Sequence, residues 1–168
     1  IGRCTFAIEI GDDLWAPVPP SSFHALQGAQ IIVNLSADRE ILMREQYRSS
    51  LIGQHSAKTI SGYVYASAGF GESTSDNVYA GAGYIWENGY RLAENERFQT
   101  VSSMIIADID IEKIENLRRG TAGFKTVSPE GTDAASYYRL YDRRSLGDAA
   151  ETDFEKKLCR HIEPHPFV

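Results

Sequence analysis

Short β-rich runs of apolar residues recur along the first two thirds of the chain, separated by turn residues and by one long amphipathic segment. Such runs, bounded by Gly, Pro, Asn or Asp, are typical of strands. The first run is apolar on both faces except at Glu9, which predicts a largely buried, central strand. The predicted strands are Thr5–Ile10, Ile31–Leu35, Tyr63–Ala68, Val78–Trp86, Tyr90–Ala93 and Val101–Ile109, with Asn88-Gly89 as the hairpin turn between Val78–Trp86 and Tyr90–Ala93.

Helical spacing of apolar residues is clearest between the second and third of these runs. Apolar residues recur over Ile41–Ile60 among Arg, Glu, Gln and Lys, which predicts a long helix with Asp38 as its N-cap and Gly62 at its end. Shorter helices are predicted over Phe23–Leu26 and Ile111–Arg119. Strands that alternate with helices in this order predict a layered α/β sandwich.

The composition is that of a globular protein with a hydrophobic core. The chain has 168 residues, of which 42% are hydrophobic and 24% are charged, enough for one ordinary domain. Its 17 Lys and Arg face 23 Asp and Glu, giving a formal net charge of -6. Because phosphate binding needs a concentrated basic face, nucleic acid is not expected as the main partner.

The two cysteines and the chain ends add further expectations. Cys4 and Cys159 lie near opposite ends without metal-ligand spacing, so we expect no metal site, no disulfide framework and a reducing, intracellular compartment. No apolar run is long enough to cross a bilayer, so no membrane partner is expected. The chain starts at Ile1, directly before a strand, which indicates a piece of a longer protein. From Gly120 onward Gly, Ser, Pro and Asp increase, which predicts an irregular arm or linker.

The turn after the first strand is the strongest candidate for chemistry. In α/β hydrolytic folds a nucleophile often lies on a sharp turn after a buried strand, where nearby backbone N–H groups stabilise an oxyanion. The stretch FAIEIGDDLWAPVPPSSFHAL resembles the nucleophile segment of the nitrilase-type (carbon–nitrogen hydrolase) glutaminase domain of glutamine-dependent NAD synthetases. Over roughly residues 5–119 the pieces IIVNLSA, YVYASAGFGESTSD, YIWENG and LAENERF resemble the same family in the same order, and the terminal PHPFV resembles its linker.

This resemblance implies an α/β fold that is part of an α-β-β-α nitrilase-like sandwich. Residues 1–119 would be the C-terminal part of the glutaminase domain, and residues 120–168 an arm leading to a synthetase domain outside this chain. The family hydrolyses glutamine with a Cys-Glu-Lys triad and passes the ammonia to ATP-dependent amidation of nicotinic acid adenine dinucleotide. The family's glutamate and lysine would precede this segment.

The same resemblance implies the partners of the chain. They are glutamine, the N-terminal half of the domain and the synthetase domain, with homo-oligomeric assembly in the cytoplasm. No cofactor is expected in this chain, because ATP and Mg would be bound by the synthetase domain. Association is also expected from the apolar strand faces that a partial sandwich exposes.

At the position of the family's nucleophilic cysteine this sequence has Gly11. Glycine has no side chain to attack an amide, so we predict that the chain is inactive as written, while the strained turn still forms because glycine accepts positive φ. The substrate-binding positions implied by the resemblance are Asp12, Trp15, Asp38, Glu72 and Ser73, with Thr74 beside them. Asp12 stands where the family usually has glutamate, and Asp38 where serine is common.

Several other polar residues have plainer structural explanations. Asp12 and Asp13 form a candidate catalytic pair, but acidic residues in a turn more often cap backbone N–H groups. A buried Glu9 needs a partner, which we expect to be a basic residue such as Arg48 or one outside this chain, in a structural role. Cys4 precedes the strand and lies too far along the chain to replace the missing thiol.

The histidines and the second cysteine carry little chemistry by themselves. His24 and His55 are single histidines on predicted helices, without a second ligand four residues on. Cys159 is followed by Arg160 and His161, but sequence neighbours rarely form a catalytic dyad. The aromatic residues expected in the core or in subunit contacts are Tyr63, Tyr65, Tyr79, Tyr84 and Trp86.

Two functions of different kinds therefore stay open. The first is a part of a glutamine-hydrolysing domain whose nucleophile position is empty. The alternative is a non-catalytic nitrilase-like scaffold or ligand-binding module. A weaker third option is a hydrolase that uses the carboxylate of Asp12 or Asp13.

Overall fold

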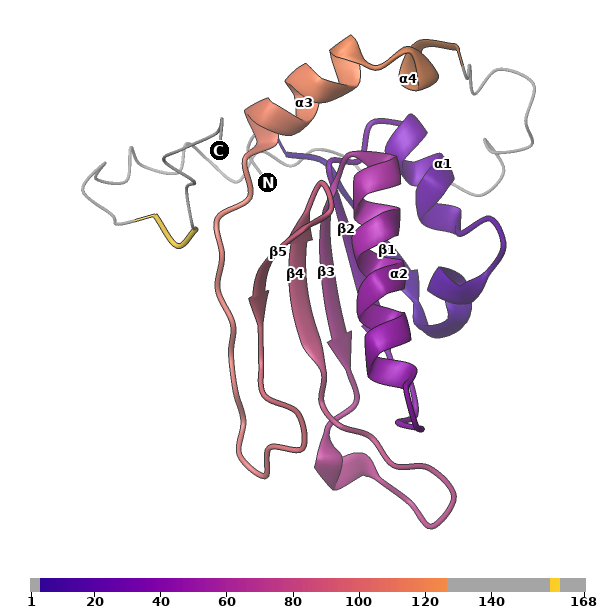
Figure 1. Cartoon of the computed structure of the whole chain (residues 1–168), viewed down its shortest axis with the longest axis vertical. Coiled ribbons are helices and arrows are strands. Elements are labelled where there is room, and N and C mark those ends of the chain that lie inside the picture. The colour runs from indigo at the N-terminus through magenta and orange to yellow at the C-terminus, as the bar shows by residue number, and fades with distance from the viewer. Residues whose placement is uncertain (1–3, 127–157, 161–168) are drawn as a thin grey trace.

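The computed structural model describes residues 4–126 and 158–160, and these form one mixed sheet with helices (Figure 1). The sheet has five strands in the order β1-β2-β3-β4-β5. The first three strands are parallel, and β4 and β5 are antiparallel additions at one side. The strands are β1 (Phe6–Ile10), β2 (Ile31–Ser36), β3 (Gly62–Ser67), β4 (Gly83–Glu87) and β5 (Tyr90–Glu94).

Two helices cover one face of this sheet, and two more lie beyond the amino ends of the parallel strands (Figure 1). Short 3-10 turns follow β1 and β3, at the opposite ends. The helices are α1 (Pro20–Leu26), α2 (Arg44–Thr59), α3 (Ile111–Gly120) and α4 (Ala122–Thr126), and the 3-10 turns are η1 (Gly11–Trp15) and η2 (Phe70–Glu72). Within the described part of the chain, no helix is long and apolar enough to cross a membrane.

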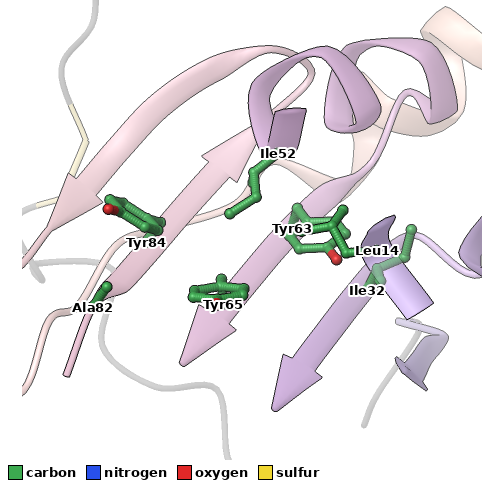
Figure 2. Packing of buried hydrophobic residues seen from close by; sticks show 7 residues of the cluster. All are labelled: Leu14, Ile32, Ile52, Tyr63, Tyr65, Ala82 and Tyr84. Atoms are coloured by element: carbon green, nitrogen blue, oxygen red, sulfur yellow. The ribbon is translucent and has the colours of Figure 1, made fainter. Parts of the chain in front are cut away.

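The core lies between the sheet and α2. Alternate residues of a strand point to opposite faces, and on β3 this places Tyr63 and Tyr65 under the helix. Tyr65 lies opposite Tyr84 of β4, and their ring centroids are 5.9 Å apart. The cluster, drawn in Figure 2, consists of Leu14, Ile32, Ile52, Tyr63, Tyr65, Ala82 and Tyr84. The expectation that these tyrosines belong to the core is confirmed.

The other face of the sheet is apolar and largely uncovered. Phe6, Ile8 and Ile10 of β1 are 49%, 53% and 67% exposed, and Leu35 of β2 is 52% exposed. The predicted exposure of apolar strand faces is therefore confirmed. The predicted central, buried position of the first strand is wrong, because β1 lies at an edge of the described sheet and only its helix-facing side is covered.

The long helix begins later than its apolar spacing predicts. It starts at Arg44, after Met43 in the left-handed conformation (φ 66°), so residues 37–43 are not helical. Asp38 is not its N-cap, because the Asp38 carboxylate is bound by arginines of the helix instead. At the other end Ile60 terminates the helix, and Gly62 is already the first residue of β3.

The predicted strand over Val101–Ile109 is absent from the described sheet. Residues 101–110 run alongside the sheet without ladder pairing, and Ile105, Ala107 and Ile109 are less exposed than their neighbours. A Cβ on Gly62 would lie 2.9 Å from Ile109 Cδ1, so this side chain packs directly on the sheet. The apolar alternation reflects side-chain packing, not strand pairing.

The bounds of the remaining elements differ less from those predicted. Residues 78–82 precede β4 as irregular chain, so the predicted strand is real only from Gly83. The hairpin turn forms as predicted, with positive φ at both Asn88 and Gly89. Most of the predicted arm after residue 120 lies outside the described residues. Its first residues form α4, and Arg160 returns to pair with Glu87.

Candidate functional site

The candidate site lies at the carboxyl ends of the three parallel strands. Gly11 follows β1, Asp38 follows β2 by two residues, and Glu72 follows β3 by five. Since parallel strands end at the same edge of a sheet, these three segments share that edge, although they are distant in sequence. Ligands of open α/β sheets bind outside this edge.

Gly11 has the conformation that the turn was expected to need. Its φ is +56°, in the left-handed region that side chains with a Cβ rarely adopt, and no atom lies within 4 Å of the place where a Cβ would stand. Asp13 stabilises the turn, because its carboxylate accepts a hydrogen bond from the Ile10 N–H at 2.9 Å. The capping role expected for an acidic residue here is therefore confirmed for Asp13.

Trp15 ends the same 3-10 turn and forms an aromatic–cation stack. The Arg44 guanidinium carbon lies 3.5 Å from the centroid of its ring, and the Tyr47 ring centroid is 5.4 Å away. Such a cation–π contact fixes the guanidinium in place. The stack joins the turn that begins at Gly11 to the first turns of α2.

Asp38 is the centre of a buried ionic cluster. One carboxylate oxygen accepts hydrogen bonds from Arg44 Nη2 at 2.9 Å and Nε at 3.1 Å, and the other accepts from Arg48 Nη1 at 3.1 Å. Arg48 is fully buried and also pairs with Glu40. Burial alone would lower the pKa of Arg48, but the hydrogen bond with Glu40 holds that pKa above its ordinary value.

Glu9 does not pair with Arg48, so that expectation is wrong. Its buried carboxylate accepts hydrogen bonds from the Tyr63 hydroxyl, from Asn34 Nδ2 at 3.4 Å and from the Ser21 N–H at 3.2 Å. Burial and the Glu9 charge together raise the pKa of Tyr63. These bonds join β1, β2, β3 and α1, in line with the structural role expected for Glu9.

A buried Ser–His pair adjoins this network, and the sequence contained no signal for it. Ser21 Oγ and His55 Nε2 are 2.7 Å apart, linking α1 to α2. Burial lowers the pKa of His55. The two residues are separated by 34 positions, so only the packing of the helices brings them together.

The loop after β3 is held by its own hydrogen bonds. Glu72 accepts from the Gly69 N–H at 2.6 Å, Ser73 Oγ from the Tyr79 N–H at 3.0 Å, and Thr74 Oγ1 from the Asn77 N–H at 3.1 Å. Within the described residues, none of these three side chains bonds to the turn at Gly11. Asp12 is exposed beside Gly11.

The remaining candidate residues from the sequence are Cys4, His24 and Cys159. Burial raises the pKa of the Cys4 thiol and lowers that of His24. The N–H of Cys159 donates to Asp108 at 2.5 Å. The part of the chain that the structure describes holds no group of three His, Cys, Asp or Glu side chains placed for a metal ion. A cavity of about 560 Å³ lies between α2 and residues 94–98, but Gly11 does not line it.

The fold defines the class of protein. The chain superposes on a carbon–nitrogen hydrolase from Helicobacter pylori G27 with a TM-score of 0.59 and 17% identity, over 83% of this chain and 51% of that chain. It superposes on a glutamine-dependent NAD+ synthetase from Acinetobacter baumannii with a TM-score of 0.51 and 15% identity, over 56% and 18%. The chain therefore has the α/β fold of the nitrilase-type carbon–nitrogen hydrolases.

Comparison of the sequence with known proteins identifies similar enzymes. The chain is 44% identical over 163 residues to the glutamine-dependent NAD(+) synthetase of Mycobacterium tuberculosis (strain ATCC 25618 / H37Rv), covering 96% of this chain and 23% of the relative. The enzyme of Mycobacterium leprae is 44% identical over 116 residues, and the human one 28% over 112. No family model matches the sequence. The resemblance deduced from the order of the motifs is confirmed. The match covers only part of each relative: 23% of the Mycobacterium tuberculosis enzyme, 17% of the Mycobacterium leprae enzyme and 16% of the human one.

Proposed function

We propose that this chain is part of the glutamine amidohydrolase domain of a glutamine-dependent NAD synthetase, with an empty nucleophile position at Gly11. The observation that carries the proposal is the left-handed, open turn at Gly11, in a chain that is 44% identical to such synthetases over 96% of its length. A left-handed turn directly after a strand is compatible with a nucleophile elbow, and Gly11 carries no thiol.

The missing thiol at Gly11 determines which chemistry the proposed site can perform. Amide hydrolysis of this type needs a thiolate to form a bond with the amide carbon, and glycine supplies no such atom. The side chains proposed to contact the amide substrate are Asp12, Trp15, Asp38, Glu72 and Ser73. Such a site binds an amide without cleaving it.

The wider role is part of the same proposal. In the complete protein, residues 1–119 would be the last part of the glutaminase domain and residues 120–168 the connection to a synthetase domain. That domain would bind ATP and Mg and amidate nicotinic acid adenine dinucleotide with the ammonia. Assembly would be homo-oligomeric and cytoplasmic.

The test is to restore the thiol with Gly11→Cys in the complete polypeptide that carries this sequence. Ammonia release from glutamine should be at background in the parent and clearly measurable in the variant, because the side chain enters open space. Gly28→Cys is the matched control, since Gly28 also has positive φ and open space but lies after α1. Both rates are measured up to high glutamine, so that kcat and KM are separated.

If Gly11→Cys releases no ammonia at any glutamine concentration, the alternative function is preferred, a non-catalytic nitrilase-like scaffold or ligand-binding module. A carboxylate-based hydrolase is disfavoured because Asp13 is engaged by the Ile10 N–H. Ammonia release by the parent that Asp12→Ala abolishes would overturn the proposal in favour of that mechanism.

A further inference from the structure

Glu87 is a buried carboxylate whose partners come from two distant segments of the chain. Its side chain is 1% exposed and ends β4, opposite Gly62 at the beginning of β3. At the start of α3, Lys113 Nζ donates to Oε1 at 2.9 Å and the Asp110 N–H donates to Oε2 at 2.8 Å. Arg160 then presents Nη1 and Nη2 to the two oxygens, at 3.1 and 3.0 Å. A carboxylate bonded in this forked way is a specific acceptor for a guanidinium group.

Residues 158–160, here called the return segment, are attached by polar contacts. Figure 1 shows this segment beside the extended stretch that precedes α3, and the Asp108 N–H donates to the Cys159 carbonyl at 3.2 Å. The Cys159 N–H donates back to the Asp108 carboxylate at 2.5 Å. The Leu158 side chain is 58% exposed, whereas that of Arg160 is 14% exposed. Among these contacts, the one made by Arg160 reaches a fully buried acceptor.

Glu87 keeps two other donors when Arg160 leaves. The Asp110 N–H and Lys113 both belong to the start of α3, so their bonds do not require the return segment. The carboxylate is therefore not left as an unpaired buried charge. Burial by itself would raise the pKa of Glu87, but the three donors together hold that pKa below its ordinary value. The fold is thus compatible with both a docked and a released return segment.

We propose that Glu87 is a docking site for the guanidinium of Arg160, and that the return segment is a releasable strap fastened to the sheet at this point. The point lies at the amino ends of the parallel strands, the edge opposite Gly11. In the proposed function, the connection to a synthetase domain would start from this fixed position, away from the candidate site. That orienting role rests on the proposed function, whereas the docking itself does not.

Hydrogen exchange of the complete polypeptide tests the docking directly. Arg160→Met should accelerate exchange of the Asp108 and Cys159 amides about tenfold, because both amides bond across the contact. The Asp110 amide should stay protected, since its acceptor is still in place. Arg119→Met, which changes an exposed arginine of α3, is the matched control and should alter none of the three. Unchanged exchange at Asp108 and Cys159 overturns the proposal, and equal acceleration at Asp110 shows general unfolding and contradicts a strap.

A disulfide trap measures the docked fraction independently. Asp108→Cys introduces a thiol next to Cys159, and the rate at which the two sulfurs join under mild oxidation reports how often the return segment is docked. Adding Arg160→Met or Glu87→Gln should slow this rate about tenfold, and both together should slow it no further, because each removes the same contact. Arg160→Lys should give an intermediate rate, since it keeps the charge without the fork. Equal rates in all these backgrounds overturn the proposal.

The orienting role is read separately, by small-angle scattering of the complete polypeptide. Arg160→Met should increase the radius of gyration, and Arg119→Met should leave it unchanged. An unchanged radius together with faster exchange at Cys159 overturns the orienting role and leaves the docking site intact. Inactivity of Gly11→Cys refutes the proposed function alone, since neither the exchange nor the disulfide measurement involves glutamine.

Discussion

The two faces of the sheet contradict the simple rule that polar residues lie outside and apolar residues inside. The face under α2 buries Glu9, Asn34 and Arg48, each at most 2% exposed. The opposite face exposes Phe6, Ile8, Ile10 and Leu35 by about half or more. These three buried side chains each have hydrogen-bond or ionic partners within the described residues, although Asn34 Oδ1 and Arg48 Nε have none, whereas the apolar face has only residues of the 101–110 segment against part of it. The face under α2 is thus covered and largely partnered, and the other face requires a cover.

The strongest way to break the covered face is Arg48→Met. This change keeps the length of the side chain but leaves Asp38 and Glu40, with 3% and 9% side-chain exposure, with one cation fewer between them at a position where Arg48 itself is fully buried. We expect a loss of about 3–5 kcal/mol in the free energy of unfolding of the 168-residue chain, measured in urea. Arg91→Met is the control, because its pair with Glu94 is exposed and is worth less than about 1 kcal/mol. Equal effects of the two substitutions would contradict this account of the cluster.

A milder break of the same face is Glu9→Gln. The amide keeps the shape but replaces a charged acceptor of three hydrogen bonds with a neutral one that carries two donors. We expect a loss of about 1–2 kcal/mol, again measured by urea unfolding. Tyr63→Phe should cost a similar amount because it removes one of the donors. A gain in stability from Glu9→Gln would show that the network is not satisfied as the structure indicates.

The covered face should also make stability depend on pH. The pKa of His55 is lowered by burial, so the unfolded chain binds this proton more readily than the folded chain. Stability should therefore fall as pH decreases through and below the ordinary histidine pKa of about 6.5. In His55→Asn the slope of unfolding free energy against pH should be smaller between about pH 6.5 and 5. His24 contributes a slope of the same sign, so the variant should retain part of it.

On the open face, Ile8→Lys should have the smallest effect on stability, less than about 0.5 kcal/mol, because this side chain is more than half exposed. Its effect on association should be clear. The parent chain is expected to self-associate with rising concentration, and Ile8→Lys should shift it toward the monomer in size-exclusion chromatography with light scattering. A parent that stays monomeric at high concentration would remove the need for a cover on this face.

The local pattern predicted those features whose cause is local. The cores of β1, β2 and β3 follow from their β-branched and aromatic runs, and the hairpin follows from Asn88-Gly89, where both residues have positive φ. Gly11 belongs to this group, because a turn that needs positive φ is compatible with glycine. The order of several short motifs also predicted the relatives, since each motif adds independent information.

Tertiary structure decided which partners the polar residues found. Aspartate is a residue type that often caps helices, and Asp38 precedes α2. It nevertheless binds Arg44 and Arg48, because the chain between β2 and α2 turns back on the helix. The sequence was compatible with an ion pair between Glu9 and Arg48. In the folded chain Glu9 instead accepts a hydrogen bond from Tyr63, and Arg48 pairs with Glu40. The alternation over 101–109 looks like a strand, but in the structure this segment packs side chains such as Ile109 on the sheet and forms no ladder with it. Local propensity is encoded residue by residue, whereas these choices depend on distances between residues far apart in the chain.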